Sequence, residues 1–240
     1  MKESLVKYTE QLKINLTEDQ LEQFQTYYEM VVEKNKVMNL TAITEKEEFA
    51  LKHFADSLSV VAAFDGTSYL SERALNVIDI GTGAGFPGIP LKIAFPNLKV
   101  TLLDSLNKRV LFLQEVIDEL GLTDIEAIHA RAEEGARTKL RESFDLAVSR
   151  AVAAQSILSE YCLPYVKKGG LFVAYKSGDI EEELNASTKA TGILGGKIKD
   201  TVYITLPDSD ISRSFVLTEK IKPTPGKYPR KPGTAKKEPL

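Results

Sequence analysis

From Leu75 onward, short apolar runs rich in β-branched residues alternate with longer amphipathic segments. This alternation is typical of parallel strands joined by crossover helices, and it excludes all-helical and all-strand folds. The expected strands cover 76–80, 99–104, 124–129, 144–149, 170–176, 198–206 and 213–221. The expected helices cover 88–95, 107–120, 133–141, 154–167 and 179–192. The sequence therefore predicts a doubly wound, Rossmann-like α/β sheet.

The last two expected strands are separated only by Pro207 to Ser212. A helical crossover between parallel strands needs about a dozen residues, so this connection is too short for one. We therefore expect an antiparallel hairpin at the end of a seven-stranded, mostly parallel sheet.

A helical extension is expected ahead of the sheet. Thr17 and Gln20 form a capping box before apolar residues at helical spacing, which predicts a helix to about Lys36. Thr44 and Glu47 form a second capping pair, and the helix that follows is expected to reach the turn at residues 65–66. We therefore divide the chain into a helical extension (1–70), a Rossmann-like domain (71–221) and a tail (222–240).

The tail differs from the rest of the chain in charge. The whole chain has 31 basic and 34 acidic residues, a net charge of −3. Residues 220–240 alone carry seven Lys and Arg side chains and one Glu, or +6, which leaves −9 for the remainder. A basic, Pro- and Gly-rich tail on an acidic body suggests an anionic partner for the tail, although such tails are often only solvated ends.

Cysteine use and hydropathy bear on the compartment. Cys162 is the only cysteine, so no internal disulfide can form, and the first residues lack the basic-then-apolar layout of a signal peptide. No apolar run approaches the roughly 20 residues that span a bilayer. We therefore expect a cytoplasmic protein without a membrane segment. With two histidines and no cysteine near them, we expect no metal site.

The sharpest motif is a glycine loop, DIGTGAGFPG, that follows the first expected strand from Asp79. Glycines let backbone N–H groups approach a ligand closely, and the following helix N-terminus favours anions. Residues 83–88 also fit the dinucleotide pattern G-x-G-x-x-G, but Gly81 already closes the strand and position 86 is Phe. This register and the terminal hairpin favour the class I methyltransferase variant of the fold.

The ligand of the loop is not decided by the acidic residue of the next strand. Asp104 ends that strand, where a carboxylate can hold the ribose hydroxyls of either NAD or S-adenosylmethionine. An NAD-dependent oxidoreductase therefore stays open as an alternative, although no Tyr-x-x-x-Lys pair is present. A non-catalytic RNA-binding module and a small-molecule methyltransferase also stay open.

Longer motifs point to one family. Asp79 to Pro90, Leu103 to Leu113, Ser149 to Ala151 and Lys227 to Gly233 resemble the bacterial ribosomal small subunit methyltransferase G family, also called glucose-inhibited division protein B. The likeness also includes Met38 to Thr41 and His53 to Leu58, so it spans nearly the whole chain. It implies an S-adenosylmethionine-dependent class I methyltransferase that methylates N7 of a guanine in the decoding-region loop of 16S ribosomal RNA.

The expected cofactor contacts come from both lines of reasoning. The glycine loop and the second strand indicate Asp79, Gly81, Gly83, Gly85 and Asp104. The resemblance supports Gly81 and adds Phe86, Ala132, Glu133 and Arg150. Two of these have plainer alternatives, because Phe86 could be an apolar plug under the loop and Glu133 an acid favoured in the first turn of a helix.

The resemblance also implies RNA contacts. Arg150 is expected beside the transferred methyl group and the target base, and Tyr228 and Arg230 offer a stacking ring and a phosphate-binding fork. The expected RNA contacts are Arg150, Lys176, Lys227, Tyr228, Arg230 and Lys231. His53, Asp56 and Ser57 share a helical face without an assigned role, although the resemblance suggests that this segment closes one wall of the RNA cleft.

The expected chemistry requires no proton transfer. Guanine N7 is a lone-pair acceptor, so it can attack a methyl group without a general base, and we assign no catalytic acid or base. The expected partner is 16S ribosomal RNA or the small ribosomal subunit, and we expect a monomer.

Overall fold

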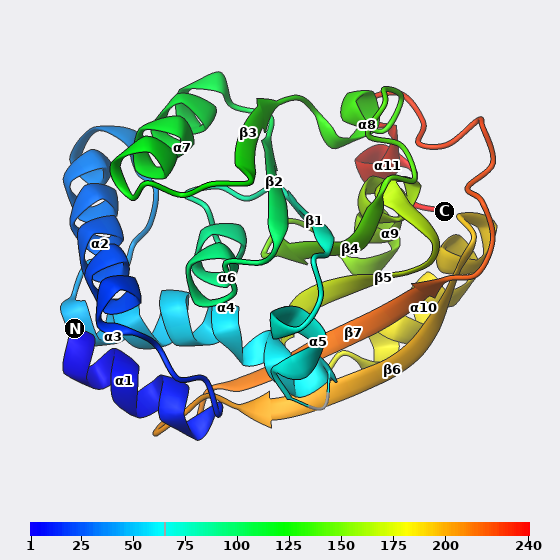
Figure 1. Cartoon of the computed structure of the whole chain (residues 1–240). Coiled ribbons are helices and arrows are strands. Elements are labelled where there is room, and N and C mark those ends of the chain that lie inside the picture. Colours follow the sequence, from blue (N-terminus) through cyan, green and yellow to red (C-terminus); the bar gives the residue numbers. More distant parts are fainter. Residues whose placement is uncertain (65) are drawn as a thin grey trace.

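The computed structural model describes residues 1–64 and 66–240, so the turn expected at residues 65–66 lies partly outside the described residues. Its sheet has seven strands in the order β3-β2-β1-β4-β5-β7-β6 (Figure 1). The strands are β1 (Asn76–Ile80), β2 (Lys99–Asp104), β3 (Ile125–His129), β4 (Phe144–Arg150), β5 (Val166–Ser177), β6 (Gly196–Thr205) and β7 (Ser212–Lys220). β7 runs antiparallel to both β5 and β6, while the other pairs are parallel. The predicted mostly parallel sheet with a terminal hairpin is confirmed.

The strand order reverses between β1 and β4. β2 and β3 extend from β1 to one side, and β4 and β5 extend to the other. Open α/β sheets bind ligands at the carboxyl ends of the strands beside such a reversal. The site is therefore expected where β1 and β4 end.

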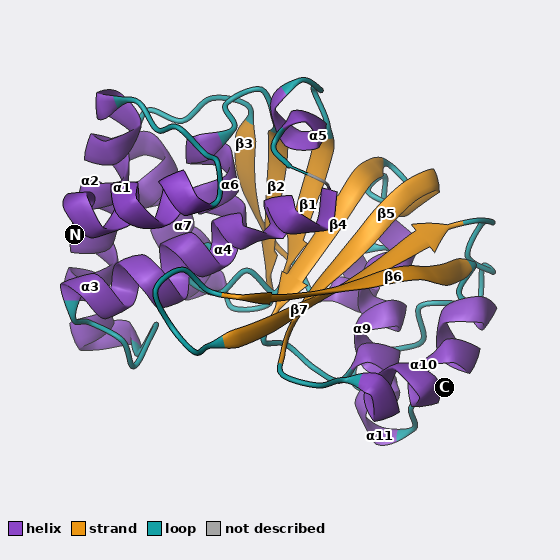
Figure 2. Cartoon of the chain, turned by 90° about the horizontal axis from the view of Figure 1, so that it is seen from below, coloured by secondary structure: helices purple, strands orange, loops and turns teal. Residues whose placement is uncertain are grey.

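Helices cover both faces of the sheet (Figure 2). The N-terminal part contains α1 (Lys2–Gln11), α2 (Glu18–Met38), α3 (Lys46–Phe49), the π-helical η1 (Ala50–Ala55), α4 (Asp56–Leu58), the 3-10 segment η2 (Ser59–Phe64) and α5 (Ser68–Ser71). The crossover segments contain α6 (Gly88–Ala94), α7 (Asn107–Glu119), α8 (Ala132–Gly135), α9 (Gln155–Cys162), the 3-10 segment η3 (Leu163–Tyr165) and α10 (Glu181–Ile193), and α11 (Thr234–Lys237) follows near the C-terminus. No helix among the described residues is long and apolar enough to cross a membrane.

Alternate strand residues face two separate cores, as the period of a strand requires. Val77 and Leu102 pack with the N-terminal helices, α6 and α7, whereas Ile78 and Leu103 pack with the α9 side of the sheet. The N-terminal helices therefore share one continuous core with the sheet. This position brings η1 and α4 to the carboxyl edge of the sheet.

Three local predictions differ from the structure. Thr17 and Gln20 form the expected capping box, but the second cap is Glu45, whose carboxylate accepts from the backbone N–H of Glu47, and not Thr44. The helix expected over 133–141 is only α8, because Glu142 takes a left-handed conformation and its N–H bonds to Pro164. The helix expected over 154–167 ends at Cys162, since the η3 turn containing Pro164 leads directly into β5.

Candidate functional site

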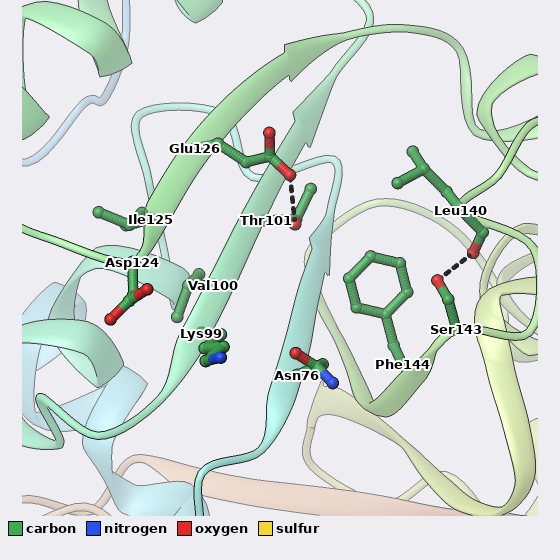
Figure 3. Close-up of a pocket in the computed structure, with 10 residues that line it drawn as sticks. All are labelled: Asn76, Lys99, Val100, Thr101, Asp124, Ile125, Glu126, Leu140, Ser143 and Phe144. Carbon is green, nitrogen blue, oxygen red and sulfur yellow. Dashed lines mark hydrogen bonds between the residues drawn. The ribbon is translucent and has the colours of Figure 1, made fainter.

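Cavities lie at both edges of the sheet. One of about 490 Å³ is at the amino edge, where Asn76, Lys99, Ile125 and Phe144 lie at or near the starts of four strands (Figure 3). Ligands of open α/β sheets bind at the opposite, carboxyl edge. Two cavities lie there, and they contain most of the residues that the sequence singles out.

The first of these, here called the loop cavity, lies where β1, β2 and β3 end. It is lined by Ile80, Gly81, Leu103, Ser105, Ala130, Arg131, Ala132, Glu133, Val152, Tyr161, Gly233 and Lys236. Its volume of about 170 Å³ is below the roughly 300 Å³ of typical ligand pockets. A nucleoside-sized ligand must therefore extend beyond it along the sheet edge toward the glycine loop.

Asp79 braces the glycine loop from below. Its Oδ2 accepts hydrogen bonds from Thr82 Oγ1 at 2.6 Å and from the backbone N–H of Gly88 at 2.8 Å. The side chain is fully buried, and burial raises the pKa of Asp79 to about 6. Its Oδ1 has no hydrogen-bond partner. The geometry therefore makes Asp79 a support of the loop, and only Oδ1 is left for a further donor.

Asp104 fixes the other side of the loop. Its Oδ2 accepts from the backbone N–H of Gly83 at 2.9 Å, and its Oδ1 accepts from that of Leu106 at 2.9 Å. Arg109 lies 3.5 Å from the same carboxylate. Each carboxylate oxygen can accept more than one hydrogen bond, so Asp104 keeps acceptor capacity for a ligand hydroxyl.

The glycines of the loop serve different purposes. A Cβ on Gly85 would lie 2.5 Å from the Tyr27 hydroxyl, and a Cβ on Gly81 would lie 2.7 Å from Val152. A Cβ on Gly83 would meet nothing within 4 Å. Gly81 and Gly85 are therefore required by packing, whereas Gly83 faces open space on the side where a ligand would lie.

Ala132 and Glu133 begin α8 and line the loop cavity, as expected for a cofactor contact. Glu133 is buried, and its Oε1 accepts from the backbone N–H of Gly233 at 3.0 Å. The Ala132 carbonyl accepts from the Tyr165 hydroxyl at 2.7 Å. Both residues are therefore held in place by contacts from other segments.

Phe86 lines neither carboxyl-edge cavity. Its ring is buried and stacks on His53 with centroids 4.6 Å apart, and it also packs near Tyr27 and Phe49. This placement corresponds to the apolar plug under the loop, not to an open contact surface.

The second cavity, here called the cation cavity, lies where β4 and β5 end and where η1 and α4 cover the sheet. Its volume is about 360 Å³. It is lined by Lys52, His53, Asp56, Arg150, Ala151, Ala153, Tyr175, Lys176, Ser177 and Arg213. The lining carries four Lys or Arg side chains and one carboxylate.

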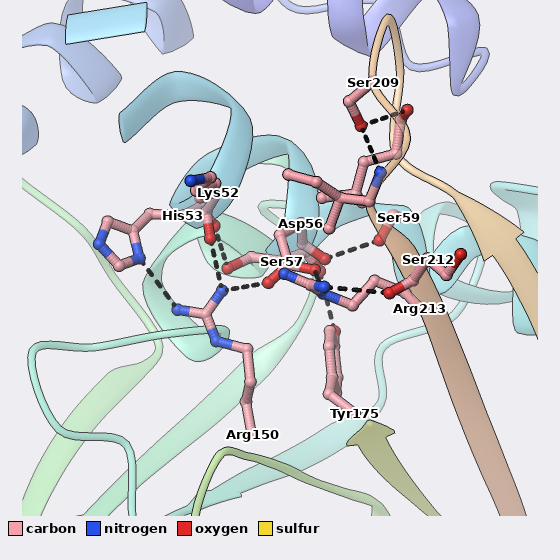
Figure 4. A network of polar contacts seen from close by, with 12 residues as sticks. Lys52, His53, Asp56, Ser57, Ser59, Arg150, Tyr175, Ser209, Ser212 and Arg213 are labelled. Carbon is pink, nitrogen blue, oxygen red and sulfur yellow. Dashed lines mark hydrogen bonds and ion pairs between the residues drawn. The ribbon is translucent and has the colours of Figure 1, made fainter. Parts of the chain in front are cut away.

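Asp56 is the centre of this cavity (Figure 4). Its Oδ2 accepts from Arg150 Nη1 at 2.8 Å, and its Oδ1 accepts from Arg213 Nε at 2.7 Å. Its side chain is only 4% exposed. Asp56 thus holds two guanidinium groups side by side, and each keeps further N–H donors for a ligand.

His53 is neutral in this setting. Burial, together with the nearby charge of Arg150, lowers the pKa of His53 to about 3. Its Nδ1 lies 3.4 Å from Arg150 Nη2, and its Nε2 lies 2.7 Å from the Thr41 hydroxyl. Lys176 donates to the Ala153 carbonyl at 2.9 Å and to Glu183 at 2.6 Å. The mobile charge of the cavity therefore lies with the arginines and Lys52.

A strip of three small residues separates the two cavities. Val152 lines the loop cavity, while Ala151 and Ala153 line the cation cavity. Ala151 has a φ of +57°, which is uncommon for a residue other than glycine. Arg150, expected at the cofactor, lies on the cation side of this strip.

The tail differs most from expectation. Tyr228 is 7% exposed, and the Arg230 guanidinium donates to both carboxylate oxygens of Glu160. The predicted stacking ring and phosphate fork are therefore wrong for Tyr228 and Arg230, because both side chains are already occupied inside the protein. Lys227 and Lys231 are exposed.

Four further residues were not found from the sequence. Arg213 reaches the cation cavity because β7 pairs antiparallel with β5, which places it beside Ser177. Asp56 was noted only for its place on a helix, and Gly233 and Lys236 were placed in a tail without a site. Only the structure brings these segments together.

Comparison with known proteins agrees with this arrangement. Residues 20–211 match a family model described as rRNA small subunit methyltransferase G. The "Ribosomal RNA small subunit methyltransferase G" of Alkaliphilus metalliredigens is 53% identical over 96% of this chain and 95% of its own length. The protein of the same name from Staphylococcus aureus is 50% identical, over 96% of each chain.

Solved structures show a similar fold at low sequence identity. M. jannaschii TYW2 in complex with AdoMet has a TM-score of 0.52 and 17% identity, over 65% of this chain and 73% of its own. A variant of MtNAS in complex with S-adenosylmethionine has a TM-score of 0.55 and 16% identity, over 85% and 72%.

Proposed function

The chain belongs to the rRNA small subunit methyltransferase G family, and on that premise we propose that it transfers a methyl group from S-adenosylmethionine to N7 of a guanine in the decoding-region loop of 16S ribosomal RNA. The observation that carries this proposal is the pair of cavities on either side of residues 151–153. One is bounded by the glycine loop and the other is rich in cations, so a cofactor and a nucleotide could bind next to each other.

The loop cavity fits the cofactor. The open side of Gly83, the remaining acceptor capacity of Asp104 and the unpartnered Oδ1 of Asp79 lie along one edge. Ribose hydroxyls suit the Asp104 carboxylate, and the adenine end suits the wall at Ala132 and Glu133. When bound, S-adenosylmethionine supplies an electrophilic methyl group on a sulfonium.

The cation cavity fits a nucleotide of RNA. Arg150 and Arg213 retain N–H donors beyond those used on Asp56, and Lys52 lies at the same cavity. Guanidinium groups bind phosphate oxygens and guanine O6 well. Most of the chain outside residues 220–240 is acidic, so a local cluster of cations is the feature that would attract RNA.

The chain's residues act by position and charge. Guanine N7 has no proton to lose, and His53 is neutral at physiological pH. In this proposal Arg150 aligns the base against the strip at Ala151, and no side chain moves a proton. Catalysis then depends on alignment and on the electrostatics of the two cavities.

We also propose that one chain is sufficient and that it acts in the cytoplasm. Residues 1–70 supply Lys52, His53 and Asp56, and residues 71–221 supply the arginines of the same cavity. In this division the helical extension serves as the wall of the RNA cavity.

The test is incubation of the protein with methyl-labelled S-adenosylmethionine and small ribosomal subunits that lack this methylation. The labelled RNA is digested to nucleosides, and the labelled position is mapped on the RNA. We expect 7-methylguanosine from the decoding region. Label on another nucleoside, or no transfer to subunits or naked 16S RNA, would refute the proposal, and equilibrium dialysis with NAD tests the oxidoreductase alternative.

A further inference from the structure

The chain after β7 is tied firmly to the body of the protein. Glu142 accepts from the backbone N–H of Thr224 at 2.7 Å. Arg141 donates to the carbonyls of Thr224 at 2.8 Å and Tyr228 at 2.9 Å. The buried Lys220 ammonium donates to the Thr224 hydroxyl at 2.7 Å. Residues 222–240 are therefore part of the fold, despite their proline-rich, basic composition.

The strongest of these anchors is the ion pair of Arg230 with Glu160 on α9. Arg230 Nε and Nη2 lie 3.0 and 2.6 Å from the two carboxylate oxygens, and the Arg230 backbone N–H donates to Oε1 at 2.7 Å. Glu160 is 1% exposed. Three donors on one buried carboxylate fix both the position and the direction of the chain at Arg230.

Beyond this anchor the chain enters the wall of the loop cavity. The Gly233 N–H donates to Glu133, and Gly233 itself lines the cavity. α11 follows, with Ala235 buried and Lys236 at the cavity. A Cβ on Gly233 would meet no atom within 4 Å, so the space beside it is open. Lys236 has no acidic partner within 4.0 Å among the described residues.

We propose that residues 230–237 form a wall of the S-adenosylmethionine site, in which Gly233 and Lys236 contact the bound cofactor and Arg230 and Glu160 are positioning residues. This inference rests on the proposed function, because it requires that the loop cavity holds the cofactor. It reverses the expectation that the tail serves RNA and not the cofactor.

The charge of the segment is consistent with this role. S-adenosylmethionine and S-adenosylhomocysteine each carry one carboxylate, and Lys236 is the lysine at the cavity. Lys237 follows it on the same short helix but does not line the cavity. The two lysines therefore form a matched pair, with equal charge and nearly equal exposure but different distance from the ligand.

The experiment is calorimetric titration of the full-length protein with S-adenosylhomocysteine, without RNA and without turnover. Lys236→Ala should weaken binding by about tenfold, the size expected for one charged hydrogen bond, while Lys237→Ala should bind like the original chain. A chain ending at Pro232 keeps the Arg230 anchor but lacks Gly233 and α11, and it should bind more weakly than Lys236→Ala. Thermal unfolding of each variant checks that it is folded.

Hydrogen exchange provides a second readout that a poorly folded variant cannot imitate. Amide exchange across residues 230–237 should slow when S-adenosylhomocysteine is added to the unmodified protein. Unchanged exchange, together with normal affinity in Lys236→Ala and in the shortened chain, would overturn the inference.

Asp104→Ala separates this failure from failure of the proposed function. If the original chain binds the ligand, Asp104→Ala loses affinity and the tail variants bind normally, the tail inference is wrong and the cofactor site stands. If the original chain does not bind S-adenosylmethionine or S-adenosylhomocysteine, the proposed function itself is wrong.

Discussion

The two cavities at the carboxyl edge are only three residues apart, but they are built in different ways. In the loop cavity the carboxylates of Asp104 and Glu133 hold backbone N–H groups, and little net charge faces the ligand. In the cation cavity Asp56 holds two arginine side chains. The first arrangement fixes the shape of a small ligand, and the second offers positive charge to a polyanion. Their stability should therefore depend on different interactions.

The largest effect is expected at the centre of the cation cavity. Asp56→Ala leaves Arg150 and Arg213 close together without their carboxylate, so the free energy of unfolding should fall by about 3 to 5 kcal/mol. Urea denaturation measures this change. Glu33→Ala removes the exposed pair with Lys36 and should cost less than about 1 kcal/mol. Equal effects of the two substitutions would show that Asp56 does not hold the cavity together.

The matching experiment on the loop cavity is Asp104→Ala. It removes the acceptor of Gly83 and the expected ribose anchor, so cofactor binding should weaken by about 1 to 3 kcal/mol. Calorimetry on the folded variant measures the loss. Asp56→Asn provides the comparison, since it changes the other cavity and should leave cofactor affinity near its original value. Normal affinity in Asp104→Ala would remove Asp104 from the cofactor site.

Arg150→Ala should separate the two cavities by kinetics. Asp56 keeps its pair with Arg213, so the variant should fold, but the base loses its alignment. The single-turnover rate of methyl transfer should fall by about 10- to 100-fold, while cofactor affinity changes little. Rapid-quench measurements at saturating cofactor and RNA give the rate. A loss of cofactor affinity as large as the loss of rate would place Arg150 in the cofactor site instead.

The smallest effect is expected from pH. The folded-state pKa of His53, about 3, lies below the unfolded value near 6.5, so His53 stays neutral above about pH 5. The single-turnover rate should therefore show no histidine step between about pH 5.5 and 8. His53→Asn and His129→Asn serve as controls. A step near pH 6.5 that disappears in either variant would mean that a proton moves and that N7 is not the target atom.

Sequence reasoning succeeded where interactions are local. The strands and the sheet order follow from hydrophobic periodicity, and the glycine loop follows from consecutive residues between Asp79 and Gly88. Gly81, Ala132 and Glu133 line the predicted cavity, and Asp104 lies beside it. These positions depend on where strands end, which the sequence shows directly.

It failed where distant segments meet. Arg213 and Asp56 are 157 positions apart, and only the pairing of β7 with β5 brings them together. Composition was also misleading for the tail, because Arg230 serves a buried carboxylate on α9 rather than solvent or RNA. Charge counts cannot show which lysines and arginines are already paired within the fold.

Phe86 connects the two ligands of this protein. The ring belongs to the glycine loop, stacks on His53, and lies 5.2 Å from the Arg150 guanidinium. A movement of the loop that accompanies occupation of one cavity therefore reaches the walls of the other. By thermodynamic linkage, any factor by which the first ligand changes the affinity of the second applies equally in the reverse direction. Phe86 is thus placed to make binding of cofactor and RNA cooperative, with either order of addition leading to the same ternary complex.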